Sequence, residues 1–325
     1  MINPENFKKQ IFSLQSNQFN DYALKVFEYQ YTYNKVYRAY CDRLEKAPQN
    51  VFQIESVPFL PIEFFKSKKV VTEEWAAEKI FKSSGTTFQS RSKHHVKDVS
   101  FYHRITKHTF EEFYGPLDDY EILALLPSYQ EQGDSSLISM IDYFMQFASS
   151  ESSYYLHNHE ELIERLNHTT NPKRLLIGVS YALLDLAEKH AFSLSDIVIM
   201  ETGGMKGRRK EMIREELHEI FKQRFGVNEI HSEYGMSELS SQGYSVNGFF
   251  KLPSWSKILI RDTNDPFTYL NSNKTGGINI IDLANIHSCA FLETKDLGKL
   301  HSDGTFSVLG RFDNSDVRGC NLLIS

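Results

Sequence analysis

A short segment combines four side-chain hydroxyls with one glycine: Ser83, Ser84, Gly85, Thr86 and Thr87. Because glycine has no Cβ, the backbone can turn sharply there and bring its N–H groups close to a ligand. The hydroxyls can donate to phosphate oxygens, and the cations Arg91 and Lys93 that follow can supply positive charge. The spacing is not that of a Walker loop. The segment is a candidate phosphate-binding turn, although such residues also gather in ordinary surface turns.

Two further clusters each follow a predicted strand. After residues 197–200, Gly203 and Gly204 leave a stretch of backbone without side chains, on which a planar ring can lie. After residues 227–232 comes a polar and aromatic run: Glu233, Tyr234, Gly235, Met236, Ser237 and Glu238. Tyr234 can stack on a base, Ser237 can donate to a phosphate, and Glu238 can bind Mg²⁺, which prefers oxygen ligands. Taken separately, each cluster also fits an ordinary turn or the start of a helix.

Two charged residues near the end of the chain complete the set of candidates. Asp296, in Asp296-Leu297-Gly298, can accept hydrogen bonds from both hydroxyls of a ribose, although Asp-x-Gly also occurs in plain hairpins. Arg311, in Gly310-Arg311-Phe312-Asp313, can bridge ribose and phosphate, or it can be a surface cation.

Composition narrows the class of protein. The chain has 325 residues, of which 41% are hydrophobic, and a net charge of −6 with a pI near 6.1. This charge does not favour a nucleic-acid or anionic-membrane surface, and no apolar run reaches membrane-spanning length. The residues after Met1 lack the features of a secretory signal. The three cysteines are widely spaced without a metal-ligand pattern, so we expect a reducing cytoplasm.

The pattern of apolar residues predicts three parts. Residues 1–60 form a helical N-terminal segment, with two helices expected in the first 46 residues. Residues 61–235 alternate strand and helix, which predicts an α/β core that binds the nucleotide and the acyl group. Residues 236–325 contain strands joined by short turns and form a smaller β-rich subdomain that completes the nucleotide site. The fold class is therefore α/β, with a mostly parallel sheet flanked by helices. Ligands of such sheets collect at the carboxyl ends of the strands, where these clusters fall.

The order and spacing of the five clusters resemble the adenylate-forming superfamily, which includes acyl-CoA synthetases and nonribosomal adenylation domains. The resemblance covers roughly residues 80 to 320. Within it, the chain is most similar to the acyl-protein synthetases of bacterial luminescence, which are LuxE-like. The similarity rests on the hydroxyl-rich turn, on Glu201-Thr202-Gly203-Gly204-Met205-Lys206-Gly207-Arg208-Arg209, and on the short chain.

Two departures from the superfamily pattern are visible. Phe88 stands where the phosphate loop usually has a glycine. The chain also ends soon after Arg311, so the C-terminal lid domain of full-length acyl-CoA synthetases, with its catalytic Lys, is expected to be absent.

The resemblance implies that ATP and a carboxylic acid, of the fatty class, form an acyl adenylate and pyrophosphate. Ser84, Thr86, Thr87 and Lys93 would hold the β- and γ-phosphates, and Glu238 would hold Mg²⁺. Tyr234 and the Gly203-Gly204 pair would enclose adenine, and Asp296 and Arg311 would fix the ribose.

The resemblance also implies that the acyl group then passes to a thiol. Cys320 is the candidate nucleophile, and a buried place in a final strand is its alternative. Cys41 and Cys289 are interpreted as structural. The acyl acceptor could instead be coenzyme A, or the chain could be a nucleotide-binding module without catalysis. An acyl-accepting reductase or carrier protein is the partner that the resemblance implies.

Overall fold

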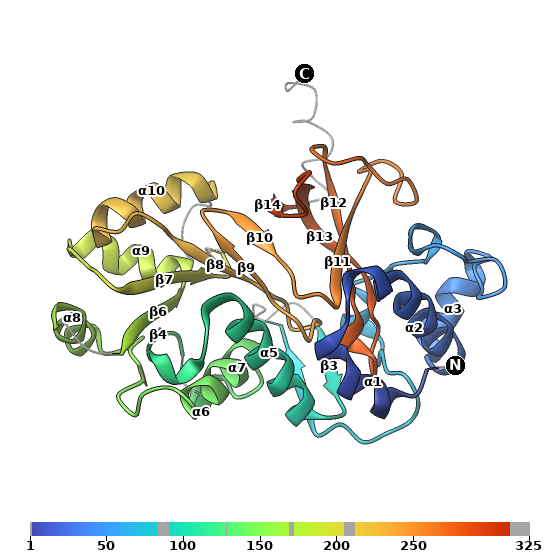
Figure 1. Cartoon of the computed structure of the whole chain (residues 1–325), viewed down its shortest axis with the longest axis horizontal. Helices are drawn as coiled ribbons and strands as arrows, with labels where there is room; N and C mark the ends of the chain where they lie inside the picture. The colour runs from blue at the N-terminus through green and yellow to red at the C-terminus, as the bar shows by residue number, and fades with distance from the viewer. Residues whose placement is uncertain (1, 84–90, 128, 169–171, 205–211, 313–325) are drawn as a thin grey trace.

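The computed structural model describes residues 2–83, 91–127, 129–168, 172–204 and 212–312 (Figure 1). Eleven strands of its main sheet run in the order β11-β12-β13-β14-β10-β9-β8-β7-β6-β4-β5, and β1 pairs with β13 at the side. One half of this sheet is parallel and the other half is antiparallel.

The parallel half lies within the range predicted to alternate strand and helix, and it also contains the short strand β5, which was not predicted. Its strands are β4 (Tyr120–Leu125), β5 (Ser153–Tyr154), β6 (Lys173–Val179), β7 (Ile197–Thr202) and β8 (His231–Tyr234). Helices cover them: α5 (Val99–Tyr114), α6 (Tyr129–Gln132), α7 (Ser136–Met145), α8 (His159–Asn167), α9 (Ser180–Lys189) and α10 (Arg214–Phe225). Every residue of β4 is buried, as expected of a parallel strand covered on both faces.

The antiparallel half continues the same sheet through the pairing of β8 with β9. Its strands are β9 (Gly243–Val246), β10 (Phe249–Lys251), β11 (Ser256–Arg261), β12 (Thr275–Asp282), β13 (Phe291–Leu300) and β14 (Phe306–Arg311). The short β1 (Leu60–Pro61) pairs with β13 in parallel orientation. The prediction of a mostly parallel sheet therefore needs correction, because the sheet is mixed. The cause is local: residues 235–242 return the chain beside β8, with Tyr234 opposite Gly243.

The N-terminal segment contains three α-helices rather than the two expected. They are α1 (Pro4–Gln10), α2 (Phe19–Tyr33) and α3 (Lys35–Arg43), and the short α4 (Phe64–Ser67) follows later. Asn34 separates α2 from α3, because its backbone is extended and its side chain accepts from the Tyr37 N–H as an N-cap.

The apolar side chains form two main clusters. The N-terminal helices share one cluster with the antiparallel strands, so that Tyr37 of α3 stacks on Phe291 of β13 with ring centroids 6.1 Å apart. The parallel strands, the last turns of α5 and helices α7–α10 form the other. Tyr234 belongs to the first cluster and Tyr244 to the second. The segment between β8 and β9 therefore connects a residue of one cluster to a residue of the other. Figure 1 shows β8 and β9 near the centre of the molecule.

A small hairpin stands apart from the main sheet within the described residues. Its strands are β2 (Lys79–Lys82) and β3 (Lys93–Val96), paired from Lys79↔Val96 to Lys82↔Lys93. Residues 83–92, which include the hydroxyl-rich turn, connect the two strands. Phe81 and Val96 pack with Tyr102 of α5 on one side of this β2–β3 hairpin.

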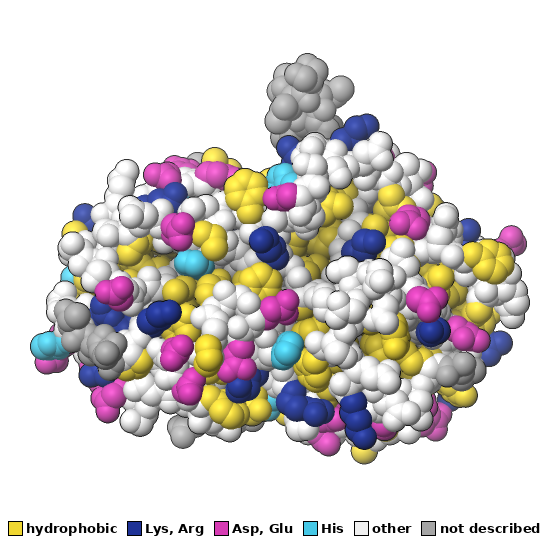
Figure 2. Space-filling view, viewed as in Figure 1, with side chains coloured by type: hydrophobic (Ala, Val, Ile, Leu, Met, Phe, Trp, Pro, Cys, Tyr) yellow, Lys and Arg dark blue, Asp and Glu magenta, His cyan; other side chains and the backbone are white. Residues whose placement is uncertain are grey.

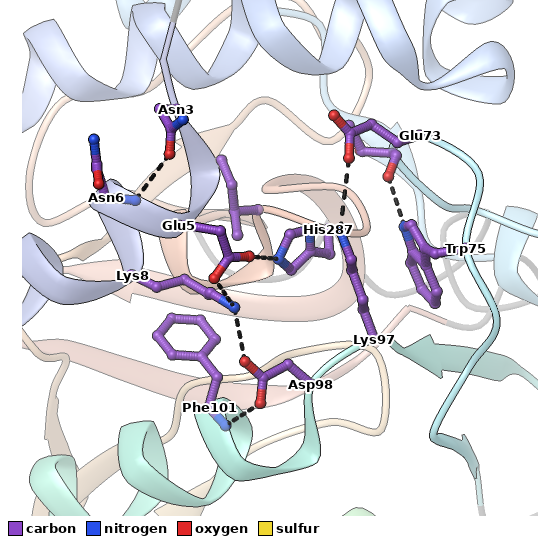
Figure 3. Close-up of polar contacts among 12 residues, drawn as sticks. Asn3, Glu5, Asn6, Lys8, Glu73, Trp75, Lys97, Asp98, Phe101 and His287 are labelled. Carbon is purple, nitrogen blue, oxygen red and sulfur yellow. Dashed lines mark hydrogen bonds and ion pairs between the residues drawn. The ribbon is translucent and has the colours of Figure 1, made fainter.

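Ion pairs tie α1 to the start of α5, directly after β3 (Figure 3). Asp98 caps α5 by accepting from the Phe101 N–H at 2.8 Å, and its other oxygen lies 2.7 Å from Lys8 Nζ. Lys8 also pairs with Glu5 at 2.8 Å, and Glu5 Oε1 lies 3.9 Å from His287 Nε2. The hydrogen bond with Lys8 lowers the pKa of Glu5. This network joins α1, the β3–α5 junction and the loop before β13.

The molecular surface shows no single dominant charge on the face of Figure 2, where basic and acidic side chains are interspersed. Among the described residues, no helix has the length and apolar character needed to cross a bilayer.

Candidate active site

Three of the predicted residues meet where the carboxyl end of β8 lies beside β13 and β14. The Tyr234 hydroxyl donates to Asp296 Oδ2 at 2.8 Å, and Arg311 Nε lies 3.3 Å from Asp296 Oδ1. Asp296 faces Arg311 because these residues are cross-strand partners in the β13–β14 ladder. Burial, and then the charge of Asp296, raises the pKa of Tyr234. Residues 62 positions apart along the chain thus share one polar cluster.

The Tyr234 ring is largely buried among other aromatic side chains. It is 9% exposed and lies edge-on to Phe250 and Phe306, with centroids 5.8 and 5.7 Å away. Arg311, in contrast, has a side chain that is 77% exposed, while that of Asp296 is 8% exposed. In this cluster Tyr234 and Asp296 are therefore held in the interior, and the cation of Arg311 faces solvent.

Glu233, beside Tyr234, points to the opposite face of β8 and is buried. The Thr202 hydroxyl donates to its Oε2 at 2.5 Å. Burial raises the pKa of Glu233 to about 7. A Cβ on Gly235 would lie 2.4 Å from Glu233 Oε1, so the carboxyl group occupies the space that any side chain at position 235 would need.

The Gly203-Gly204 turn is positioned by a buried cluster behind it. Gly203 has a φ of 68°, which favours glycine, and its carbonyl oxygen lies 3.1 Å from Ser180 Oγ. Ser180 also donates to Glu201 Oε2 at 2.7 Å, and Arg214 Nε donates to Glu201 Oε1 at 3.0 Å. Burial alone would raise the pKa of Glu201, but the hydrogen bond of His218 and the charge of Arg214 hold it at about 2. Gly204 is exposed beside this cluster.

The same cluster contains the residue types of a nucleophilic triad but not its geometry. Ser232 Oγ lies 3.4 Å from His218 Nε2, and Glu201 Oε1 lies 3.7 Å from that same nitrogen. In a triad the acid orients the other ring nitrogen. All three residues are also buried, so we interpret the cluster as structural.

Hydrogen bonds join the two ends of the segment that carries the hydroxyl-rich turn. We call these ends, Ser83 on one side and Arg91 with Ser92 on the other, the neck of the turn. Ser83 N donates to Ser92 O at 3.2 Å, and Ser92 N donates to Ser83 Oγ at 3.0 Å. Arg91 donates to the Ser83 carbonyl and pairs with Asp134, which also pairs with Lys82 at 3.2 Å. Ser83 and Arg91 thus hold the two ends of the turn together.

Several predicted residues lie outside the described part of the chain or away from the cluster. Those outside it are Ser84, Gly85, Thr86, Thr87, Phe88 and Cys320. Lys93 is described and exposed, and the alternation of β3 places its side chain opposite to those of Ser92 and His94. The structure therefore does not bring Lys93 to the side of β3 that faces Glu238.

Ser237 and Glu238 lie against the β2–β3 hairpin. His94 Nδ1 lies 2.8 Å from the Ser237 carbonyl oxygen, and a hydrogen bond joins Ser92 to the Glu238 side chain. Glu238 is 6% exposed, and burial raises its pKa. On the other side, Asn285 Nδ2 donates to the Glu238 carbonyl at 2.8 Å. Glu238 lies in a hydrogen-bonded turn, not at the start of a helix.

The donor set suits Mg²⁺ bound together with phosphates. No group of three or more His, Cys, Asp or Glu residues in the described part of the chain could hold a metal alone. Mg²⁺ commonly uses one or two carboxylates and takes its other ligands from substrate phosphates and water. Glu238 supplies one such carboxylate next to the neck of the candidate phosphate turn, so the residues fit this mode of binding.

Two of the three cysteines are inaccessible. Cys41 and Cys289 are both 0% exposed. Burial raises the pKa of Cys41 to about 12 and raises that of Cys289 as well. Neither thiol is available as a thiolate at neutral pH.

Sequence reasoning missed the residues that connect the clusters: Ser92, His94, Asp134, Ser180, Arg214 and Asn285. Arg91 was considered only as a cation after the turn, and His94 was given no role. Their partners lie 43 and 143 positions away, and no local pattern marks such pairs.

Comparison with known proteins identifies a family that matches this chain and solved structures with a similar fold. A profile of the family described as "Acyl-protein synthetase, LuxE" matches residues 9–325. A search of curated proteins found no match.

Among solved structures, a 2-hydroxyisobutyryl-CoA ligase with 2-HIB-AMP has a TM-score of 0.66 and 12% identity, covering 92% of this chain and 68% of that one. ATP-bound MatB from Rhodopseudomonas palustris has a TM-score of 0.54 and 14% identity, covering 74% of this chain and 49% of that one. O-succinylbenzoate coenzyme A synthetase from Bacillus subtilis, in complex with AMP, has a TM-score of 0.51, 19% identity and coverages of 73% and 49%. The chain thus spans about half the length of the first structures it matches. At these identities the likeness shows the fold alone.

Proposed function

Because this chain belongs to the LuxE family of acyl-protein synthetases, we propose that it activates a fatty acid with ATP and passes the acyl group to a protein thiol. In fold terms we propose that the described residues form the nucleotide-binding domain of an adenylate-forming ligase. The observation that supports the proposal is the contact of Tyr234, Asp296 and Arg311, three residues that the family resemblance assigns to one nucleoside.

In the proposed first step, a carboxylate oxygen of the acid attacks the α-phosphorus of ATP, and the bond to the bridging oxygen of pyrophosphate breaks. Both reactants are anionic, so the site must align them and offset their charge. Tyr234 and the Gly203-Gly204 backbone border the adenine position, and Asp296 accepts from the ribose hydroxyls. Arg311, exposed and beside Asp296, can turn toward the ribose and the α-phosphate.

The residues around the turn hold the leaving group. The hydroxyls of Ser84, Thr86 and Thr87 are proposed to donate to the β- and γ-phosphates, with Ser237 as a further donor. Ser83 closes the neck of that turn. Glu238 is proposed to hold Mg²⁺, which when bound supplies positive charge to the phosphates.

In the proposed second step, a thiolate attacks the carbonyl carbon of the acyl adenylate, a thioester forms and AMP leaves with the electron pair. The thiol proton passes to solvent. Cys320 is the proposed nucleophile, because the other two cysteines of the chain are buried and protonated. The acceptor of the acyl group from Cys320 is proposed to be a separate protein, in accord with the family.

The test is ATP–pyrophosphate exchange with a panel of fatty and aromatic acids, followed by acyl labelling. We expect exchange with a fatty acid and radiolabel that stays on the protein through gel filtration and is released by hydroxylamine. Cys320→Ser should retain exchange and lose the label. Label that forms only on added coenzyme A would replace the protein acceptor with coenzyme A. Absence of exchange with every acid, in protein that binds ATP, would leave only nucleotide binding.

A further inference from the structure

The strand that carries Asp296 leaves its regular pairing just at this residue. Strands β11 to β14 lie side by side in the antiparallel half (Figure 1). Where the register between β12 and β13 shifts, β12 has the single residue Ile278 and β13 has three, residues 294–296. Such an insertion is a β-bulge, which interrupts the ladder and redirects side chains. We call residues 294–296 the Asp296 bulge, and the direction of the Asp296 side chain depends on what holds it.

Two side chains provide the hydrogen bonds that the interrupted ladder lacks. Buried backbone groups at a bulge need such partners. The Ile278 carbonyl accepts from Arg261 Nη1 at 2.9 Å and from the Thr294 hydroxyl at 2.8 Å. The Thr294 carbonyl accepts from Arg261 Nη2 at 2.6 Å, and the Thr294 hydroxyl accepts from the Asp296 N–H at 3.1 Å. Arg261 and Thr294 thus bond to both strands at the bulge.

Arg261, the last residue of β11, is itself fixed by its surroundings. It is 6% exposed, and its Nη1 also donates to Asn279 Oδ1 at 2.8 Å. A Cβ on Gly277 would lie 2.5 Å from Arg261 Cζ, so the guanidinium lies directly against the backbone of β12. The centroid of the Phe312 ring lies 5.4 Å from the same Cζ. A planar guanidinium donates in fixed directions, which suits it to hold the carbonyls of two strands at a set spacing.

The acidic neighbour of Arg261 is more distant than these oxygens. Glu293 Oε1 lies 3.8 Å from Arg261 Nη2, whereas the hydrogen bonds of the guanidinium to uncharged oxygens are 2.6 to 2.9 Å long. The arrangement therefore serves the backbone of the bulge more directly than it serves an ion pair.

The Asp296 carboxylate has little freedom once the bulge is held. Its side chain is 8% exposed, and its Oδ2 accepts from the Tyr234 hydroxyl at 2.8 Å. The next strand follows the bulge as well, because the Lys295 carbonyl accepts from the Phe312 N–H at 2.7 Å. A change in the shape of the bulge would move the carboxylate relative to Tyr234, and therefore relative to the proposed position of the ribose.

We propose that Arg261 and Thr294 are positioning residues for nucleoside binding: they hold the Asp296 bulge so that the Asp296 carboxylate meets the ribose hydroxyls. The two residues act through Asp296 and do not themselves touch the nucleotide. This inference rests on the proposed function, because it takes the ribose role of Asp296 from there. Its measure is the ribose preference, defined as the Kd of dideoxy-ATP, which lacks both ribose hydroxyls, divided by the Kd of ATP.

Four substitutions separate the placement of Asp296 from general stability. Arg261→Met keeps the apolar stem and removes the donors, and Thr294→Val keeps the branched shape and removes the hydroxyl. Thr294→Ser restores the hydroxyl. The matched control is Arg174→Met in β6 of the parallel half: Arg174 is 4% exposed, and its guanidinium donates to four backbone carbonyls at 2.9 to 3.4 Å.

The ribose preference is measured by equilibrium binding, and the melting temperature of every variant is recorded. The wild type should bind ATP at least about tenfold more tightly than dideoxy-ATP, because hydrogen bonds to a charged acceptor are strong. Arg261→Met and Thr294→Val should reduce this preference to less than about threefold, since the carboxylate no longer meets the hydroxyls. Thr294→Ser and Arg174→Met should keep it. Both arginine variants should melt at a lower temperature, so a loss of stability alone does not explain the difference between them.

The inference is wrong if folded Arg261→Met or folded Thr294→Val keeps the wild-type ribose preference, or if Arg174→Met loses that preference equally. If Arg261→Met does not fold, the comparison of Thr294→Val with Thr294→Ser decides, because the two differ in the hydroxyl that bonds to the bulge.

Equilibrium binding also keeps the two proposals apart. If the wild type prefers ATP but exchanges with no acid, the proposed acyl activation fails while the binding series still decides the role of Arg261 and Thr294. If the wild type exchanges but binds ATP and dideoxy-ATP equally, the ribose role of Asp296 fails, and this inference fails with it.

Discussion

The carboxylates of the candidate site differ in environment more than in type. Asp296 has two hydrogen-bonding neighbours, the Tyr234 hydroxyl and Arg311. Glu238 is buried with one hydroxyl partner, and burial raises its pKa. Glu233 is buried against Thr202, with a pKa near 7. These environments suit the different roles proposed for them: Asp296 as an acceptor for ribose hydroxyls, Glu238 as a ligand for a cation, and Glu233 as a protonated buried carboxyl group.

The need of Glu238 for a cation leads to the first prediction. Glu238→Gln keeps the shape of the side chain but cannot supply a negative ligand, so exchange should fall by at least about 100-fold. Because burial disfavours the ionised form of Glu238, the neutral amide should unfold at the same temperature or a higher one. Exchange assays and thermal unfolding of the same preparation measure both effects. Wild-type exchange in this variant would end the metal assignment.

Glu233 makes stability depend on pH. Its pKa is about 7 in the folded protein and 4.5 ordinarily, so the folded state binds the proton more tightly. Between these values the folded state carries more protons than the unfolded state, and the free energy of unfolding falls as pH rises. The full contribution of Glu233 to the free energy of unfolding is present below pH 4.5. About 3 kcal/mol of this free energy is lost as pH rises from there through about 7.

Glu233→Gln tests this dependence, because the amide resembles the protonated carboxyl group. We expect the variant to be more stable than the wild type at pH 8 and equal to it at pH 4.5. Denaturant titrations at pH 4.5, 6, 7 and 8 measure the difference. If the free energies of unfolding of the two proteins changed with pH in the same way over this range, Glu233 would be ionised in the folded state.

At the scale of elements, the β2–β3 hairpin depends on Asp134. The Asp134 side chain is 33% exposed, so its ion pairs with Lys82 and Arg91 contribute little to global stability. Their effect is local, because they hold the neck of the proposed phosphate turn. Asp134→Ala should therefore raise the KM for ATP about tenfold and change the free energy of unfolding by less than about 1 kcal/mol.

The matched control for this hairpin contact is Asp118→Ala, in an exposed turn before β4. It removes an equal charge and should leave the KM for ATP unchanged. Equal effects of the two substitutions would mean that Asp134 acts only through net charge.

Local patterns in the sequence predicted most elements of the parallel half. Within the predicted alternation of strand and helix, the sequence has an apolar run at residues 121–126 and helical spacing of apolar residues from 135 to 147, and the structure has β4 and α7 there. Tyr234 could be predicted because it ends a buried strand and turn residues follow it. Asp296 was expected in a loop at a strand end, but it lies within β13 opposite Arg311. The contacts of His94 and Asp134 could not be predicted, since they depend on how the hairpin docks. The continuity of the sheet through β9 also depends on long-range pairing, which leaves no periodic signal.

At the scale of the whole molecule, the N-terminal helices are part of the core beneath the antiparallel strands. Gln30 of α2 is 0% exposed and 255 positions from its partner Asn285. Its amide donates to the carbonyls of Asn285 and Ile286 at 2.9 and 3.2 Å, and its carbonyl accepts from the Ala290 N–H at 2.9 Å. The Asn285 side chain in turn holds the Glu238 carbonyl. A helix near the start of the chain thus supports the candidate metal ligand.

Gln30→Met tests this support, because methionine keeps the length of the side chain and removes all three hydrogen bonds. The Asn285 carbonyl keeps its hydrogen bond from the Ser288 N–H, but the Ile286 carbonyl and the Ala290 N–H lose the partner that Gln30 gives them, which should cost about 3 kcal/mol in the free energy of unfolding. Gln49→Met, at an exposed position, should cost nothing measurable. Denaturant titration measures both, and exchange assays well below the melting temperature should show a raised Mg²⁺ requirement for Gln30→Met alone. A loss of stability without a raised Mg²⁺ requirement would mean that Gln30 stabilises the core but does not support Glu238. A free energy within 1 kcal/mol of the wild type would instead mean that the 285–290 loop holds its own shape without α2.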